Sequence, residues 1–201
     1  GRDFRLSAPN EIHFHPPGGL LLPGQTRTST MDLSDRLIEH DYWHTARLLE
    51  QAAGLPDEAL DRAVRPGFVI HDFEGPEPDL RTLLERIVFT QEVWTAAIGG
   101  TEFPTHTDRG IAALQSRWVT VHERFAALVR RIRDRHEWDD AFVDALCTPP
   151  ASFTFGSVVA HILNASAVRR QMAVSVLREL GVADVETRDA IEWERLISAS
   201  A

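Results

Sequence analysis

Four long stretches in which apolar residues recur at helical spacing constrain this fold more than any other feature of the sequence. They cover about residues 32–53, 79–98, 107–136 and 152–180. Within each stretch apolar side chains return every three or four residues, which places them on one face of an α-helix. No alternation of apolar and polar residues is long enough to indicate a β-strand. The sequence therefore predicts an all-α protein built as a four-helix bundle.

Glycine and proline mark the ends of these stretches and the connections between them. Gly54 and Pro56 follow the first stretch, and Gly99-Gly100 ends the second, as expected where helices stop. Residues 64–78 contain three clusters of proline or glycine. This segment is therefore predicted to be a long crossover connection.

The predicted inward faces of the helices include polar side chains. The inward row of the first stretch consists of Leu33, Leu37, His40, His44 and Leu48. Both histidines are thus expected to face the core. The row of the second stretch consists of Leu83, Ile87, Thr90 and Trp94. In the fourth stretch His161 lies on the inward row with Val158 and Ala165.

Residues 1–30 differ in composition from the rest of the chain. They are rich in glycine, proline, serine and threonine and show no regular period, so we expect an N-terminal extension followed by a bundle domain in residues 31–201. Burying the three leucines at 20–22 contributes on the order of 5–8 kcal/mol, less than the cost of ordering about thirty residues. We therefore expect the extension to lie across the bundle or a partner subunit, with His13 or His15 near the mouth of the bundle pocket.

Charge and composition exclude several classes of protein. Acidic residues outnumber basic ones by 30 to 21, a formal net charge of −9, which argues against nucleic acid as a partner. Every basic residue is arginine, which indicates a GC-rich bacterial genome and excludes a lysine Schiff base. Cys147 is the single cysteine, so internal disulfides and thiolate metal clusters are excluded. No apolar run is long enough for a membrane span and no secretory signal is visible, so a cytoplasmic location is expected.

Histidines within the predicted helices are the first candidates for chemistry. Phosphate-binding glycine loops, HExxH, CxxC and GxSxG motifs are absent. His40 and His44 are one turn apart, a spacing that can present two imidazoles to one metal ion. Alternatively, both are partly buried and bonded to carboxylates such as Glu39 or Asp41. His161 is either a satisfied core residue or a group for acid–base chemistry.

A series of short motifs runs through the predicted helices in a distinctive order. They are His40–Thr45 with Leu48-Leu49, Leu55–Leu60, Leu80–Glu85 with Glu92–Trp94, Pro149-Pro150, Thr154–Gly156, Ala160–Asn164, Arg169-Arg170, Leu177–Gly181 and Ile191–Glu194. In order and spacing these motifs resemble the DinB/YfiT-like superfamily, in particular its actinobacterial members, over roughly residues 31–195. The resemblance implies a four-helix bundle with long first and third connections, frequently as a homodimer.

The resemblance also implies a chemistry. Many members hold a divalent metal, typically zinc or nickel, through three histidines, one in the second helix and two in the fourth. Characterised relatives include metal-dependent hydrolases and transferases or isomerases that use mycothiol or bacillithiol. The matching positions here are Arg86, Ala165 and Arg169, so all three ligands are replaced. No cofactor is expected at the family's metal position, and a low-molecular-weight thiol stays a candidate.

Two arginines at metal-ligand positions leave two interpretations open. A guanidinium stays protonated, repels a cation and must be paired when it is buried. Arg86 and Arg169 either form ion pairs with internal carboxylates, such as Glu92 or Glu85, or hold an anionic ligand in a bidentate manner.

The first functional hypothesis is a divergent enzyme that works without the family metal. It would act as a transferase, isomerase or cyclase on a small anionic or carbonyl-containing metabolite, by analogy in specialised metabolism. The proton-transfer candidates are His161, His40 and His44. The substrate-binding candidates are Arg86, Arg169, Trp43 and Trp94.

Two other hypotheses use the same residues differently. One is a non-catalytic small-molecule-binding or resistance protein on the same bundle. The other is a relocated metal site formed by His40, His44 and His161, or by His13 and His15 of the extension. In all three cases the expected partners are a small molecule and a second copy of the chain, without nucleic acid or membrane.

Overall fold

The computed structural model describes residues 31–64, 67, 69–71, 75–144 and 148–199. All of them belong to one compact unit that begins at Met31. The predictions for residues 1–30, including those for His13 and His15, and the role of Cys147 lie outside the described residues. The elements are α1 (Leu33–Ala52), α2 (Asp57–Leu60), α3 (Leu80–Gly99), α4 (Ile111–Asp134), β1 (Ala141–Asp144), β2 (Ala151–Thr154), α5 (Phe155–Glu179) and α6 (Ala190–Ala199).

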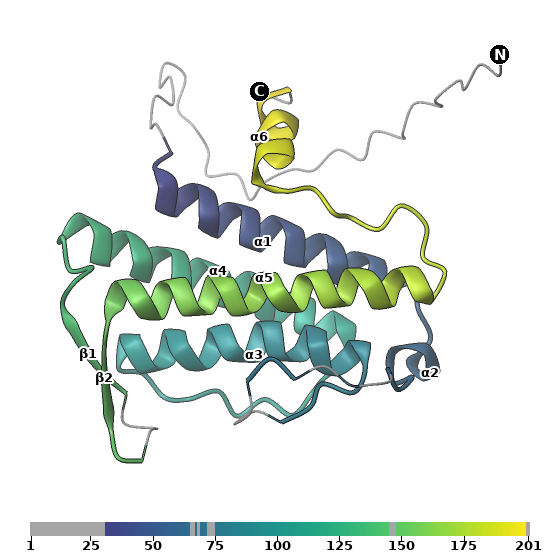
Figure 1. Cartoon of the computed structure of the whole chain (residues 1–201), viewed down its shortest axis with the longest axis horizontal. Helices are drawn as coiled ribbons and strands as arrows, with labels where there is room; N and C mark the ends of the chain where they lie inside the picture. The colour runs from purple at the N-terminus through teal and green to yellow at the C-terminus, as the bar shows by residue number, and fades with distance from the viewer. Residues whose placement is uncertain (1–30, 65–66, 68, 72–74, 145–147, 200–201) are drawn as a thin grey trace. The chain divides into compact units, whose positions relative to one another are not determined.

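The four long helices α1, α3, α4 and α5 form the bundle that the apolar spacing predicts (Figure 1). Helix α1 packs against α4 and α5, and α3 packs against the same two helices. Consecutive helices α1 and α3 therefore lie on opposite corners of the bundle. This placement explains the long connection between them, because the chain must cross the end of the bundle and return along α3.

The core divides into two apolar clusters along the bundle. The cluster towards α2 includes Leu48, Leu84, Trp118 and Leu177. The cluster towards the hairpin includes Ile38, Phe125, Ile132 and Ile162. In the row predicted for α3, Leu83 and Ile87 are buried and Thr90 is 9% exposed, whereas Trp94 is only partly buried.

The inward row predicted for α1 is wrong at its beginning. Leu33 and Leu37 are 72% and 43% exposed, respectively. The buried row is instead formed by Ile38, Asp41, Thr45, Leu48 and Ala52. Both rows follow helical spacing and both contain two polar residues, so apolar periodicity does not distinguish them.

A short β-hairpin, which the sequence did not predict, joins α4 to α5. Strands β1 and β2 pair antiparallel, with Phe142 opposite Phe153. Strands of four residues are too short for apolar alternation to be a clear signal. At the start of α5, Gly156 allows close approach: a Cβ there would lie 3.1 Å from the Trp138 carbonyl oxygen.

The segment after α5 packs back onto α1. Its last element, α6, buries Trp193 against the ring of His40, with ring centroids 5.9 Å apart. Arg36 of α1 forms an ion pair with Glu194 of α6. Gln51 receives a hydrogen bond from the Glu186 backbone N–H and donates one to the Asp184 carbonyl. The C-terminal segment thus covers one side of α1 (Figure 1).

Candidate functional site

Arg86 and Arg169 face each other across the α3–α5 interface and share one carboxylate. Arg169 Nε donates to Glu77 Oε1 at 2.9 Å. Arg86 Nη1 lies 3.4 Å from the same oxygen and donates to the Gly75 carbonyl at 3.0 Å. Glu77 belongs to the crossover connection, three residues before α3. We call Arg86, Glu77 and Arg169 the Arg–Glu–Arg cluster.

The Arg–Glu–Arg cluster is buried. The side chains of Glu77 and Arg169 are both 0% exposed, and Arg169 Nη1 also lies 3.3 Å from Thr90 Oγ1. Burial raises the pKa of Glu77, and the charges of Arg169 and Arg86 oppose that shift. Glu77 Oε2 finds no hydrogen-bond partner among the described residues. The Glu77 carboxylate thus contacts two guanidinium groups, that of Arg169, which is fully buried, and that of Arg86, whose side chain is 21% exposed.

Glu77 is a site residue that sequence reasoning missed. The expected partners were Glu92 and Glu85, because both lie on α3 near Arg86. Glu92 instead forms a two-point ion pair with Arg117. The signal in the sequence was that Glu77 stands between two prolines, shortly before the cap of α3. A single acidic residue in a loop belongs to no periodic pattern, so its burial could not be predicted.

The residues present do not fit the metal that the superfamily resemblance implies. Ala165 has no donor atom, and Arg86 and Arg169 carry permanent positive charge. Within the described ranges, no three histidine, cysteine or carboxylate side chains are grouped so that they could hold a metal ion. No step of chemistry is therefore assigned to a metal at this position.

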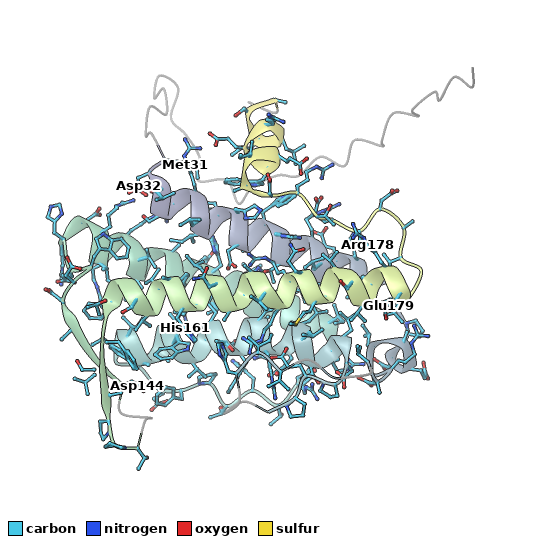
Figure 2. The ribbon with its side chains drawn as sticks, viewed as in Figure 1. Met31, Asp32, Asp144, His161, Arg178 and Glu179 are labelled. Atoms are coloured by element: carbon cyan, nitrogen blue, oxygen red, sulfur yellow. The ribbon has the colours of Figure 1, made fainter. Side chains whose placement is uncertain are left out.

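His161 lies two helical turns from Arg169 on α5, on the side that faces α3 (Figure 2). Its ring centroid is 5.7 Å from that of Trp94 in an edge-on arrangement and 5.0 Å from that of His71. His71 comes from the crossover connection and was not predicted as a site residue. The structure therefore brings Trp94 and His161 together, as the sequence hypothesis required.

His40 and His44 form a different group, on α1 beneath the C-terminal segment. Their ring centroids are 5.7 Å apart, and Trp43 lies beside both. Each Nε2 is 3.0 Å from a backbone carbonyl oxygen, that of Arg188 for His40 and that of Glu186 for His44. The structure does not place these rings with His161, so the seven predicted side chains fall into two groups.

The electrostatics of His44 differ from those of a free imidazole. Burial and the nearby Arg170 guanidinium lower the pKa of His44 to about 4. At neutral pH its Nε2–H therefore donates to the Glu186 carbonyl. A pKa that far below neutrality is poorly matched to proton transfer near pH 7. Arg170 itself pairs with Asp41 and donates to Ser166 in the same buried region.

Comparison with known families decides the assignment of the fold. The model of the DinB superfamily matches residues 40–173, which is most of the bundle from α1 into α5. The chain belongs to the DinB superfamily. The matched region includes Arg86, Ala165 and Arg169 of this DinB-superfamily protein.

No curated protein matches this DinB-superfamily chain. In the part of the chain that the structure describes, no helix is both long enough and apolar enough to cross a membrane.

Proposed function

We propose that this protein binds a small metabolite and does so without the metal of the DinB superfamily. The Arg–Glu–Arg cluster supports the proposal, because it places two guanidinium groups, joined by the Glu77 carboxylate, where the superfamily resemblance implies metal-ligating histidines. Arg86 and Arg169 then stabilise the interior rather than capture an anion. The Lewis acid that the superfamily resemblance implies has no ligands at these positions, so binding would depend on the side chains of the bundle alone.

Metal content tests this proposal directly. We expect protein purified without a histidine tag to contain far less than one equivalent of zinc or nickel, and to show no heat of binding when either ion is titrated. The triple variant Arg86→His, Ala165→His, Arg169→His restores the family's ligands and is expected to gain metal, with circular dichroism as the check on its fold. One equivalent of tightly bound metal in the unaltered protein would contradict the proposal.

A relocated metal site gives a distinguishable result. If metal is present and is lost in His40→Ala or His44→Ala protein, the α1 histidines hold it. Because both Nε2 atoms face backbone carbonyl oxygens, we expect neither variant to change metal content.

A second candidate function is acid–base catalysis at His161, favoured by its contacts with His71 and Trp94. An imidazole between two other rings on a partly open helix face can exchange a proton with a carbonyl-containing substrate. A low-molecular-weight thiol would be a co-substrate in such a reaction.

Product analysis separates the two candidates. Under the binding proposal, metabolites that raise the melting temperature are recovered unchanged after incubation, with or without added thiol. Conversion that disappears in His161→Ala protein, while binding persists, would establish catalysis instead. We also propose a homodimer, which sedimentation equilibrium would show as twice the mass of the chain.

A further inference from the structure

A cavity lies between α3 and α4. It has a volume of about 360 Å³ and is closed on its third side by the connection between these helices. Its walls include neither Arg86 nor Arg169 nor His161. The volume falls within the range of small-molecule sites. We call it the α3–α4 cavity.

Arg117 and Glu92 make a fixed polar wall of the α3–α4 cavity. Arg117 Nε and Nη2 donate to the two carboxylate oxygens of Glu92 at 3.0 and 2.6 Å. Its Nη1 donates to the Asp108 carbonyl at 3.2 Å. Both charged side chains are about nine-tenths buried. Their charges cancel, and the arrangement holds α3, α4 and the connection together around the cavity.

Thr95 carries an unsatisfied hydroxyl on the wall of this cavity. The residue is 9% exposed, and its Oγ1 has no hydrogen-bond partner among the described residues. Two hydroxyls on the α4 side of the cavity do have partners. Ser116 and Thr120 each donate to the carbonyl four residues earlier, at 3.1 Å. That is the usual solution for such a side chain in a helix. Thr95 therefore has a donor and an acceptor available for a ligand.

The remaining charges of the α3–α4 cavity favour an occupant with one negative charge. Arg124 lines the cavity and forms no ion pair with the described residues. His106 Nε2 lies 3.8 Å from Glu92 Oε1, so this ring already faces a carboxylate of the cavity wall. Glu102 also lines the cavity and repels a dianion such as phosphate. One available guanidinium beside one opposing carboxylate suits a monocarboxylate better than a phosphate.

We propose that the α3–α4 cavity binds a small monocarboxylate with an oxygen substituent on the adjacent carbon, a 2-hydroxy or 2-keto acid. Arg124 pairs with the carboxylate, and the Thr95 hydroxyl exchanges a hydrogen bond with the substituent. The apolar side chains of Ala96 and Val121 contact the carbon skeleton. This inference rests on the proposed binding function and gives it a site and a ligand class.

Two probes that differ only in one hydroxyl test the proposal. Mandelate and phenylacetate are titrated separately into the ¹⁵N-labelled full chain, and backbone amide shifts are followed by NMR. Saturable shifts are expected for residues 92–106 and 116–124, with mandelate about fivefold tighter than phenylacetate, as one neutral hydrogen bond provides. Inorganic phosphate is expected to bind more weakly than either.

Matched variants assign the two contacts. Thr95→Val removes the hydroxyl and is expected to abolish the preference for mandelate, while Thr45→Val, which alters another buried threonine without a partner, preserves it. Arg124→Gln is expected to weaken both probes about tenfold or more, because a charge-assisted hydrogen bond is lost. Arg131→Gln, an exposed arginine later on α4, leaves both affinities unchanged.

The outcomes separate failure of the site from failure of the function. Saturable binding that shifts residues of the α3–α5 interface, and that survives Arg124→Gln, overturns the site but keeps the binding function. Tighter binding of phosphate overturns the ligand class. No saturable shift with either carboxylate overturns the inference, and the metabolite screen described above then decides the binding function independently.

Discussion

Arginine at a ligand position differs from histidine because its charge cannot be removed near neutral pH. A histidine that loses its metal can become neutral and stay buried. Arg169, which is fully buried, needs a negative partner at every accessible pH. Glu77 supplies it, and that carboxylate is shared with Arg86. A buried arginine at this position therefore depends on acidic residues elsewhere in the chain, and Glu77 is one of them.

Glu77→Gln tests this dependence. We expect the variant to lose about 3–5 kcal/mol of unfolding free energy, because it removes the charge of a buried carboxylate that contacts both guanidinium groups. Urea denaturation measures the loss. Glu85→Gln, on α3 and without an ion pair to the described residues, is the control and should change stability by less than about 0.5 kcal/mol. Equal stability of the two variants would contradict the buried ion pair.

The lowered pKa of His44 gives a pH-dependent stability with a definite sign. The folded state holds this pKa at about 4, against 6.5 for the unperturbed group. Below pH 6.5 the unfolded chain takes up the proton first, so stability falls as pH drops from about 6.5 to 4. The full contribution is about 3 kcal/mol.

Denaturation at several pH values checks this prediction. In His44→Gln protein the fall in stability between pH 6.5 and 4 should be smaller by the His44 contribution. His136→Asn is the control, since His136 is exposed and its positive φ of 60° suits asparagine. The hydrogen bond from the Asp35 backbone N–H lowers the pKa of Asp32 to about 2. Asp32 therefore contributes to the pH dependence of stability only in more acidic solutions. An unchanged pH profile in His44→Gln would refute the assignment.

At the scale of elements, the start of α5 depends on a capping box rather than on apolar burial. The Thr154 hydroxyl accepts from the Ser157 N–H, and the Ser157 hydroxyl accepts from the Thr154 N–H, both at 3.2 Å. These bonds satisfy backbone donors that the helix cannot satisfy itself. They also hold the hairpin strand β2 in line with α5.

Thr154→Ala is expected to lose about 1 kcal/mol of unfolding free energy, because the cap hydroxyl is removed. Thr154→Ser keeps the hydroxyl and should retain most of that stability. Thermal and urea denaturation of the three proteins measure the difference. If alanine and serine variants were equally stable, the capping bonds would not contribute.

The elements also differ in how well they can be predicted from the sequence. The four bundle helices were predicted to within a few residues because their apolar period is long and their ends carry glycine, proline or capping residues. The superfamily resemblance also predicts that Arg86, Ala165 and Arg169 stand at metal-ligand positions, and this stays a prediction. Glu77 and His71 were missed because both lie in the crossover, where position depends on how the loop packs rather than on a local pattern.

At the scale of the whole molecule, residues 31–199 contain both apolar clusters and the main packing between the bundle helices. Ion pairs from Arg130 and Arg133 to acidic residues of α1 also join two helices that are distant in sequence. These pairs are partly exposed and contribute little each. The stability of the bundle must therefore come mainly from its interior.

A chain beginning at Met31 is accordingly expected to unfold cooperatively and to keep the helical circular dichroism of the bundle. Calorimetry compares it with the full chain. A lower melting temperature after removal of residues 1–30 would support the docking predicted for them from sequence. A shortened chain without a cooperative transition would contradict an independently folding bundle.

The shared carboxylate has a consequence for the order of folding. Glu77 and Arg169 are 92 residues apart, and Glu77 reaches its partner only after α3 and α5 have packed and the crossover has closed over them. Contacts that require such a loop to close tend to form late, after the transition state. Glu77→Gln should then accelerate unfolding while leaving the refolding rate nearly unchanged. Glu77, which contacts both arginines, would thus mainly slow the unfolding of the folded state. It would determine how long the bundle persists rather than how quickly it forms.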